Sequence, residues 1–330
     1  MLSVRITGPS EAIESVLPAL RERGSVTSIL HLRGAGVAVA DQPHRQRDVV
    51  DFLLAREDAN GVTALLQDAG LQESGSIQLS MPITVISDAA DRAESVGPGD
   101  DRDDAVIWDQ VADISEDNAR LSMTFLAFLV LAALIAGVGR IIDQPVLIIG
   151  AMVVGPEFAP ISAFAFGLAF RQFRTAGRAL ATLAIGFALA IGVSWAVWGS
   201  ASLLGLVSHV EATSGARTAF IIQPDWWSFV IAVLAGITGV LSLTSSKSSI
   251  LVGVFISITT IPAVAVIGLT LAVGAWSETL EALVQLGVNV AGLVIAGVLT
   301  LLALRLLSPR LSGAVVTLRL RTRRPGRQMI

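Results

Sequence analysis

The fold is decided by two apolar stretches that contain proline, Gly150-Ala-Met-Val-Val-Gly-Pro-Glu-Phe-Ala-Pro160 and Gly253-Val-Phe-Ile-Ser-Ile-Thr-Thr-Ile-Pro262. Proline lacks an amide N–H and its ring clashes with the preceding helical turn, so each stretch is expected to interrupt a helix. Hydrocarbon cannot satisfy the freed backbone groups, so an interrupted membrane helix persists only against protein or a water-filled cavity. Corresponding interruptions in two halves of a membrane protein are typical of a transporter binding site.

The composition indicates a membrane protein with a soluble part. The 330 residues are 53% hydrophobic and 15% charged, and the mean hydropathy is +0.71. Residues 1–120 carry 10 Arg against 21 acidic residues, a net charge of −11, whereas residues 121–330 carry 13 basic and 6 acidic residues, a net charge of +7. This asymmetry predicts an acidic soluble domain ahead of a membrane region with basic flanks. The chain has no cysteine, which excludes disulfides, thiolate metal sites and a cysteine nucleophile.

The first 88 residues predict a small α/β domain. Alternating and helical hydrophobic periods suggest the order βαββαβ, which is the ferredoxin-like or ACT-like arrangement. Domains of this kind bind small effectors or self-associate, and the fold alone decides neither. The expected elements are a strand over Leu2–Thr7, a helix with Ser10 as its N-cap, a hairpin of residues 25–33 and 36–40, a mostly helical segment over 47–71, and a last strand over 76–81.

The region that follows predicts an acidic linker and an amphipathic interfacial helix within residues 89–120, with Trp108 at the level of the headgroups. A basic tail is expected over 307–330. Between them the hydrophobic runs predict six spans. They cover residues 121–141, 145–170, 177–205, 226–244, 249–274 and 281–306, and together form a transmembrane domain over 121–306. The second and fifth runs exceed the about 20 residues of a straight span, as broken helices would.

Lysine and arginine in the short loops predict the orientation. Basic residues lie between spans two and three, between spans four and five, and in the tail, whereas only Arg140 and Arg217 lie in the opposing loops. Cytoplasmic loops carry the excess of Lys and Arg, so both termini are expected in the cytoplasm and the protein in the cell membrane.

Two short matches predict an inverted 3+3 repeat. The segments Ile135-Ala-Gly-Val138 and Ile237-Thr-Gly-Val240 are 102 residues apart, since 237 − 135 = 102. The prolines Pro160 and Pro262 share that offset. An odd number of spans in each half gives the halves opposite topology. The alternative is chance similarity between spans rich in small residues.

The first break supplies the main candidate site residue, Glu157, which follows Gly155 and Pro156 and precedes Pro160. A charge at the centre of a membrane helix costs about 2.5–3.5 kcal/mol on insertion scales, so such residues are usually functional. One hypothesis is that Glu157 couples protons or coordinates a cation. The other is that a protonated Glu157 only caps the broken helix end.

The second break supplies hydroxyl groups from Ser257, Thr259 and Thr260 beside Pro262. These groups either bind a ligand or repair the interrupted backbone. Asn289, and less securely Gln285, would face the same centre from the sixth span, or form hydrogen bonds between helices. The sign of the substrate charge stays open, because helix N-termini attract anions and unwound carbonyls attract cations.

These motifs resemble the domain of unknown function 389 family of prokaryotic membrane proteins. The resemblance rests on Ile148-Ile-Gly-Ala-Met152 with Pro156 and Pro160, and on Val252-Gly-Val-Phe-Ile-Ser257 with Pro262. It covers about residues 105–308 and implies this order of spans. The family usually has an apolar residue where Glu157 stands, and often a second proline where Ala263 stands. It implies no substrate.

The leading hypothesis is a transporter of an unidentified small solute or ion, with its site between the broken spans and a regulatory or oligomerising N-terminal domain. The alternatives are a channel gated at the same breaks and a membrane-anchored sensor or scaffold. No nucleophile–base pair or metal-ligand set is visible, so we expect neither an enzyme nor a bound cofactor or metal. The three histidines are far apart in sequence and favour structural roles. Besides the bilayer and the solute, the expected partner is a second copy of the chain, and not nucleic acid.

Overall fold

The computed structural model describes residues 1–36, 47–82, 84–96, 106, 108–215, 217–218, 226–244 and 260–322, with the side chains of the last segment as far as Leu306. The chain divides into two compact units. One is formed mainly by Met1–Asp109 and the other by Gln110–Leu306.

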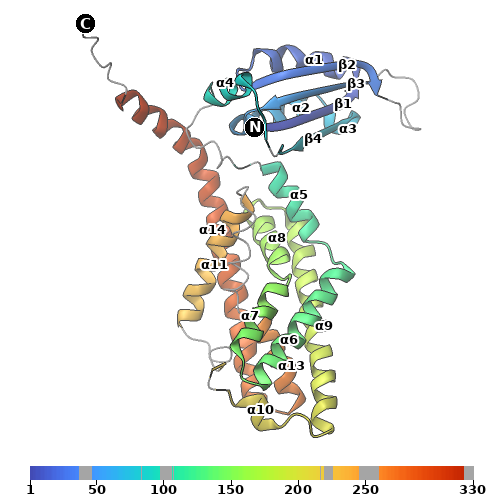
Figure 1. Cartoon of the computed structure of the whole chain (residues 1–330), viewed down its shortest axis with the longest axis vertical. Coiled ribbons are helices and arrows are strands. Elements are labelled where there is room, and N and C mark those ends of the chain that lie inside the picture. The colour runs from blue at the N-terminus through green and yellow to red at the C-terminus, as the bar shows by residue number, and fades with distance from the viewer. Residues whose placement is uncertain are drawn as a thin grey trace. The chain divides into compact units, whose positions relative to one another are not determined.

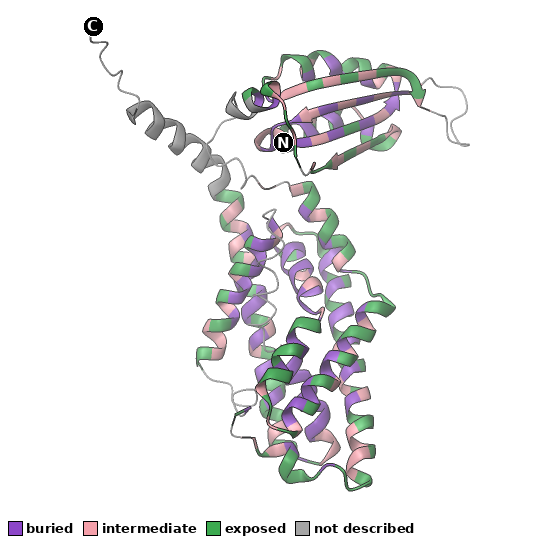
Figure 2. Ribbon diagram, viewed as in Figure 1, coloured by how far each residue is buried: buried purple, intermediate pink, exposed green. Residues whose placement is uncertain are grey.

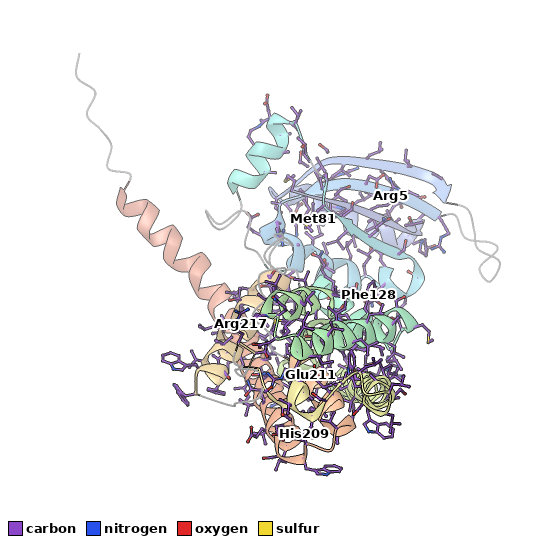
Figure 3. All side chains as sticks on the ribbon, turned by 60° about the horizontal axis from the view of Figure 1, so that its bottom comes forward. Arg5, Met81, Phe128, His209, Glu211 and Arg217 are labelled. Carbon is purple, nitrogen blue, oxygen red and sulfur yellow. The ribbon has the colours of Figure 1, made fainter. Side chains whose placement is uncertain are left out.

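The first unit is a four-stranded antiparallel sheet with helices on one face (Figure 1). Its strand order is β2-β3-β1-β4. Alternate residues of β1 and β3 are buried and pack against the apolar faces of the two longer helices. The elements are β1 (Leu2–Pro9), α1 (Ser10–Glu22), β2 (Val26–Gly36), β3 (Arg47–Leu54), a 3-10 turn at Arg56–Asp58, α2 (Ala59–Asp68), α3 (Leu71–Ser74), β4 (Ser76–Ser80) and α4 (Asp88–Val96). Arg5, labelled in Figure 3, belongs to β1 and bonds Asp51 of β3 with a 2.7 Å contact from Nε to Oδ1.

The helical interpretation of residues 47–71 is wrong in its first part. Residues Arg47–Leu54 form strand β3, which pairs with both β1 and β2, and helix begins only at Ala59. In Arg47-Asp-Val-Val-Asp-Phe-Leu-Leu54 every second side chain is buried, so the period is two rather than 3.6. The second strand of the expected hairpin is therefore β3, and residues 37–40 lie outside the described residues.

Ser10 does not cap α1, contrary to expectation. The N-cap of α1 is Pro9, and the hydroxyl of Ser10 instead donates to Asp48 Oδ1 over 2.7 Å. The same carboxylate accepts the N–H of Gly34 at 2.9 Å and lies 2.6 Å from His31 Nε2. Burial raises the pKa of Asp48, but the three hydrogen bonds outweigh it, and its pKa lies below the ordinary value of 3.8.

We predict that Asp48→Asn loosens the β2–β3 pairing and removes an acid-dependent part of the stability of this unit. Because folding lowers the pKa of Asp48, its contribution is complete above about pH 3.8 and is lost as pH falls through the lower folded pKa. Loss of one hydrogen bond to a charged group costs about 1.5–3 kcal/mol. Hydrogen exchange of β3 peptides, corrected for intrinsic rates, measures the effect. An unchanged exchange rate in the variant at neutral pH would contradict it.

The second unit is a bundle of apolar helices. Its elements are α5 (Trp108–Asn118), α6 (Met123–Ile141), α7 (Pro145–Val154), α8 (Phe158–Ala169), α9 (Phe173–Leu203), α10 (His209–Thr213), α11 (Trp226–Thr244), α13 (Thr260–Ala272) and α14 (Trp276–Thr322). In the described residues, four helices are long and apolar enough to cross a membrane, namely α6, α9, α11 and Trp276–Leu306 of α14. The pair α7 and α8 adds a fifth if it counts as one bent span. The chain is thus built as a membrane protein with several apolar helices, and the first half of the predicted span 249–274 lies outside the described residues.

Buried faces of the bundle are lined by small residues, and buried and exposed faces alternate around each helix in Figure 2. One tight contact joins α11 to α8, where a Cβ built on Gly239 would overlap the ring of Phe158. Small residues permit such contacts, which supply packing energy where lipid is as apolar as the helices. Glycine at 239 therefore positions the start of α8.

We predict that Gly239→Ala destabilises the bundle whereas Gly177→Ala does not. An added methyl at 239 meets the Phe158 ring and should cost about 1–3 kcal/mol through overpacking. No heavy atom lies within 4 Å of the corresponding methyl at Gly177 on α9, so there the substitution should gain about 0.5–1 kcal/mol of helix propensity. Thermal unfolding in detergent compares the two, and equal melting temperatures would contradict the assigned contact.

Candidate functional site

The first break consists of three residues between α7 and α8. Helix α7 ends at Val154, Gly155 is extended with φ −66° and ψ 126°, and Glu157 occupies the N-cap of α8. The two helices are bent by 54°. Pro160 is the third residue of α8, where an amide N–H would have no partner inside the helix. The break therefore lies at Gly155 and Pro156, and Pro160 lies in the first turn of the next helix.

Glu157 is buried at this break, with 2% of its surface exposed. Its Oε1 accepts a hydrogen bond of 2.6 Å from the hydroxyl of Thr260, 103 residues further along the chain. Its Oε2 is buried and has no hydrogen-bond partner among the described residues. Although Glu157 is the N-cap residue, its side chain forms no capping hydrogen bond. The side chain of Glu157 thus bonds α13 through Thr260 and makes no capping hydrogen bond to α8.

Thr260 of α13 reaches the same point. It is completely buried, and α13 is described from Thr260 onward, with Pro262 two residues later. The predicted second break, with the pathway residues Ser257 and Thr259, lies outside the described residues. The structure thus brings Glu157 of the first break into contact with Thr260 of α13.

Gly155 makes this contact possible by lacking a side chain. A Cβ at this position would overlap Glu157 Oε2 and would lie 2.5 Å from Ile261 Cγ1. The carboxylate and the first turn of α13 therefore occupy the space that a side chain at 155 would take. Gly155 is a packing requirement of the site.

Helix α14 runs parallel to α8 beside it. A Cβ on Gly297 would lie 3.1 Å from that of Ala165. Further along both helices, the guanidinium of Arg305 lies 5.4 Å from the centre of the Phe170 ring. Residue numbers rise in the same direction on both helices, so the helices share a direction over this contact.

This alignment puts two buried amides near the level of Glu157. From the contact of Ala165 with Gly297, counting back eight residues on each helix reaches Glu157 and Asn289, since 165 − 8 = 157 and 297 − 8 = 289. Gln285 lies one helical turn before Asn289 on the same face. Both amides are buried, with 1% and 2% of their surfaces exposed at 285 and 289. Gln285 Oε1 has no hydrogen-bond partner among the described residues.

Sequence reasoning missed the second buried charge of the bundle, Arg140, which it placed in an external turn. Arg140 is 1% exposed at the end of α6. It donates to the carbonyls of Thr213 and Gly215 and to the hydroxyl of Thr218, the last over 2.6 Å. Asp143 accepts the hydroxyl of Thr218 at 2.9 Å. Burial raises the pKa of Asp143, yet hydrogen bonds from that hydroxyl and from backbone N–H groups hold its pKa below the ordinary value.

The partners of Arg140 lie in the loop after α10, and the sequence carries no clear signal for their contact with the arginine. Residues after α10, which bears His209 and Glu211 in Figure 3, fold back over the end of α6. Their ligating atoms are mostly backbone carbonyls, which no residue pattern reveals. The cluster ties α6 to this loop and lies at a helix end, apart from the break.

Comparison with known proteins identifies the bundle. Residues 152–295 match the family described as "Domain of unknown function (DUF389)". This part of the chain is similar to that family. The match confirms the resemblance inferred from the two proline motifs and contains most of both motifs, from Met152 to beyond Asn289.

An uncharacterised protein of the archaeon Methanocaldococcus jannaschii is 28% identical over 195 residues. That similarity covers 58% of this chain and 58% of the relative, so the chain spans less than two thirds of the curated relative it matches. No solved structure matches the chain significantly. Neither the matched family nor this relative is described by an activity.

We predict that Glu157 and Thr260 are energetically coupled. In a double-mutant cycle with Glu157→Met and Thr260→Val, the interaction energy should be about 0.5–3 kcal/mol, because each change removes one partner of a buried hydrogen bond. Chemical unfolding in detergent gives the four free energies. Thr238→Val serves as the matched control, because its hydroxyl bonds Leu234 within α11. Coupling equal to that of the control would rule out the contact.

Proposed function

We propose that the chain is a membrane transporter of a small solute or ion, with its site where the two breaks meet. The observation that carries the proposal is the buried hydrogen bond from Thr260 to Glu157. Burying a carboxylate in a bundle this apolar costs free energy, and such residues in membrane proteins are usually functional. Breaks of this kind persist only where they line protein or a cavity.

We further propose six spans in an inverted 3+3 repeat, which the helix boundaries support. Helices α9 and α14 begin 103 residues apart, since 276 − 173 = 103.

Two helix contacts support the same repeat. Ala165 of α8 faces Gly297 of α14, and Gly268 of α13 faces Ser194 of α9. The two pairs are related by the repeat offset, since 165 + 103 = 268 and 297 − 103 = 194. Glu157 and Thr260 are themselves equivalent under this offset, since 157 + 103 = 260. A bond between equivalent residues lies on or near the two-fold axis that relates the halves, which is the usual place of a transporter site.

The N-terminal unit is proposed to be a ferredoxin-like domain that regulates or assembles the transporter. Its strand order β2-β3-β1-β4, with helices after β1 and β3, supports that assignment. We propose a homo-oligomer with both termini in the cytoplasm, on the charge pattern of the loops. A channel gated at the same breaks would use the same residues, and a sensor or scaffold would leave the centre of the bundle dry.

The test uses the absence of native cysteine. Single cysteines at Thr259, Thr260 and Asn289 are labelled with a charged, membrane-impermeant thiol reagent from each side of oriented vesicles. We expect labelling at these positions from both sides, because a transporter opens its site alternately. Gly155 is unsuitable, since a side chain there would displace Glu157.

The matched control is Ile295→Cys, six residues beyond Asn289 on α14 and 52% exposed on the outer face of the bundle. It should stay unlabelled from both sides. Simultaneous access from both sides in a single state would favour a channel. If neither Thr260→Cys nor Asn289→Cys reacts in correctly inserted protein, the transport proposal fails.

A further inference from the structure

In the described bundle, two buried acceptor oxygens lack hydrogen-bond partners, one at the break and one on α14, a helical turn from the level of Asn289. Among the described residues, Glu157 Oε2 and Gln285 Oε1 are buried without a hydrogen-bond donor. Leaving a buried acceptor unsatisfied costs about 1–3 kcal/mol, and more for a charged group. Two such oxygens at neighbouring levels of the bundle call for a species that carries positive charge or N–H or O–H donors.

No protein cation supplies that charge in the described part of the bundle. The buried charged side chains of Gln110–Leu306 are Arg140 and Glu157. Arg140 lies at the end of α6 and donates to Thr213, Gly215 and Thr218. The neighbours α7, α8, α11 and α13 contribute no buried charged group other than Glu157 in their described residues, and α14 contributes buried amides.

The number of carboxylates sets the charge of the ligand. No cluster of three His, Asp or Glu residues capable of holding a metal occurs in the described segments. Divalent ions in all-protein sites normally draw on several carboxylates. A single carboxylate with neutral oxygens balances one positive charge. Thr260 uses its proton on Oε1, which leaves the lone pairs of its hydroxyl available.

We propose that this site binds a small monovalent cation at Oε2 of Glu157, with Gln285 Oε1 and the hydroxyl of Thr260 as neutral oxygen partners. The inference rests on the proposed function, since it names the ligand of the same site. An alkali-metal ion and a proton satisfy the same chemistry, and the experiment below separates them.

The competing explanation is that the N-termini of α8 and α13 neutralise Glu157 without any ligand. A helix N-terminus carries about half a positive charge. However, the Glu157 side chain accepts no capping N–H from α8, and its described hydrogen bond on α13 comes from a hydroxyl. Pro160 and Pro262 also remove one free N–H from each first turn.

The experiment measures thermal unfolding of the full-length protein in detergent by tryptophan fluorescence. Sodium chloride and potassium chloride are titrated against choline chloride at constant ionic strength, and the series is repeated from pH 5 to pH 9. We expect a saturable rise in melting temperature with one alkali ion. Glu157→Gln should raise the half-saturating concentration at least tenfold, and Gln285→Met should raise it several-fold.

The proton alternative gives a different pattern. The melting temperature is then insensitive to sodium and potassium, and its pH dependence is flattened by Glu157→Gln but not by the control Glu281→Gln, an exposed residue of α14. Identical salt and pH responses in wild type and Glu157→Gln overturn the proposal. If Glu157→Gln does not fold, an unchanged alkali response in Gln285→Met overturns it instead.

This outcome is separable from that of the cysteine experiment. A labelled, hydrated centre without any cation or proton effect overturns only the cation inference, and the transported species is then neutral or anionic. A cation effect at a centre that no thiol reagent reaches overturns transport and leaves the ion as a structural component.

Discussion

A helix interrupted inside an apolar bundle must satisfy its free backbone groups from within the protein, and that constraint governs the arrangement of this chain. The break at Gly155 and Pro156 is tolerated because α13 packs directly against it, with Ile261 in the space above Gly155. Thr260 and Glu157 add a polar contact at the same place. If the break were exposed to lipid, its free carbonyls would each cost several kcal/mol. The second half of the bundle is therefore a structural requirement of the first.

Close packing of these helices depends on glycine at the points where they touch. Gly239 admits the ring of Phe158, Gly297 faces Ala165, and Gly268 faces Ser194. Between helices in lipid the hydrophobic effect gives no net drive, so close contact supplies the dispersion energy. At Gly155 the missing side chain leaves the room in which the carboxylate of Glu157 lies beside Ile261 of α13. Close packing and the polar contact thus depend on the same kind of residue.

Much of this arrangement could be predicted from sequence because its causes are local. Proline and glycine located the first break, and long apolar runs located α6, α9, α11 and α14 to within a few residues. The residues of the first break are consecutive, so proline and glycine point to all of them. The contact of Glu157 with Thr260 depends on helix packing that no local pattern encodes. Asn289 and Gln285 were assigned to the centre only as a possibility, and the parallel alignment of α8 and α14 is what places them near its level.

The errors have equally physical causes. The sequence predicts helix at strand β3 because Arg47-Asp-Val-Val-Asp-Phe-Leu-Leu54 is short and one of its buried positions is an acid, Asp48, whose burial depends on its three hydrogen-bond partners. The sequence also predicts Ser10 as a helix cap, because its actual hydrogen-bond partner, Asp48, lies 38 residues away and no local pattern points to it. Arg140 was read as a loop charge because backbone carbonyls, which carry no sequence signal, accept its hydrogen bonds.

If α7 and α8 form one bent span, as proposed, the break also constrains how the protein enters a membrane during synthesis. Helix α7 has 10 residues and α8 has 12, and neither is long enough to be recognised as a span by itself, which takes about 20 apolar residues. The insertion machinery must therefore accept the two halves as one segment, with Glu157 near its middle at a cost of about 2.5–3.5 kcal/mol. The strongly apolar flanks on either side offset that cost before α13 has been made. The hydrogen bond from Thr260 to Glu157 thus forms only after that carboxylate has entered the bilayer.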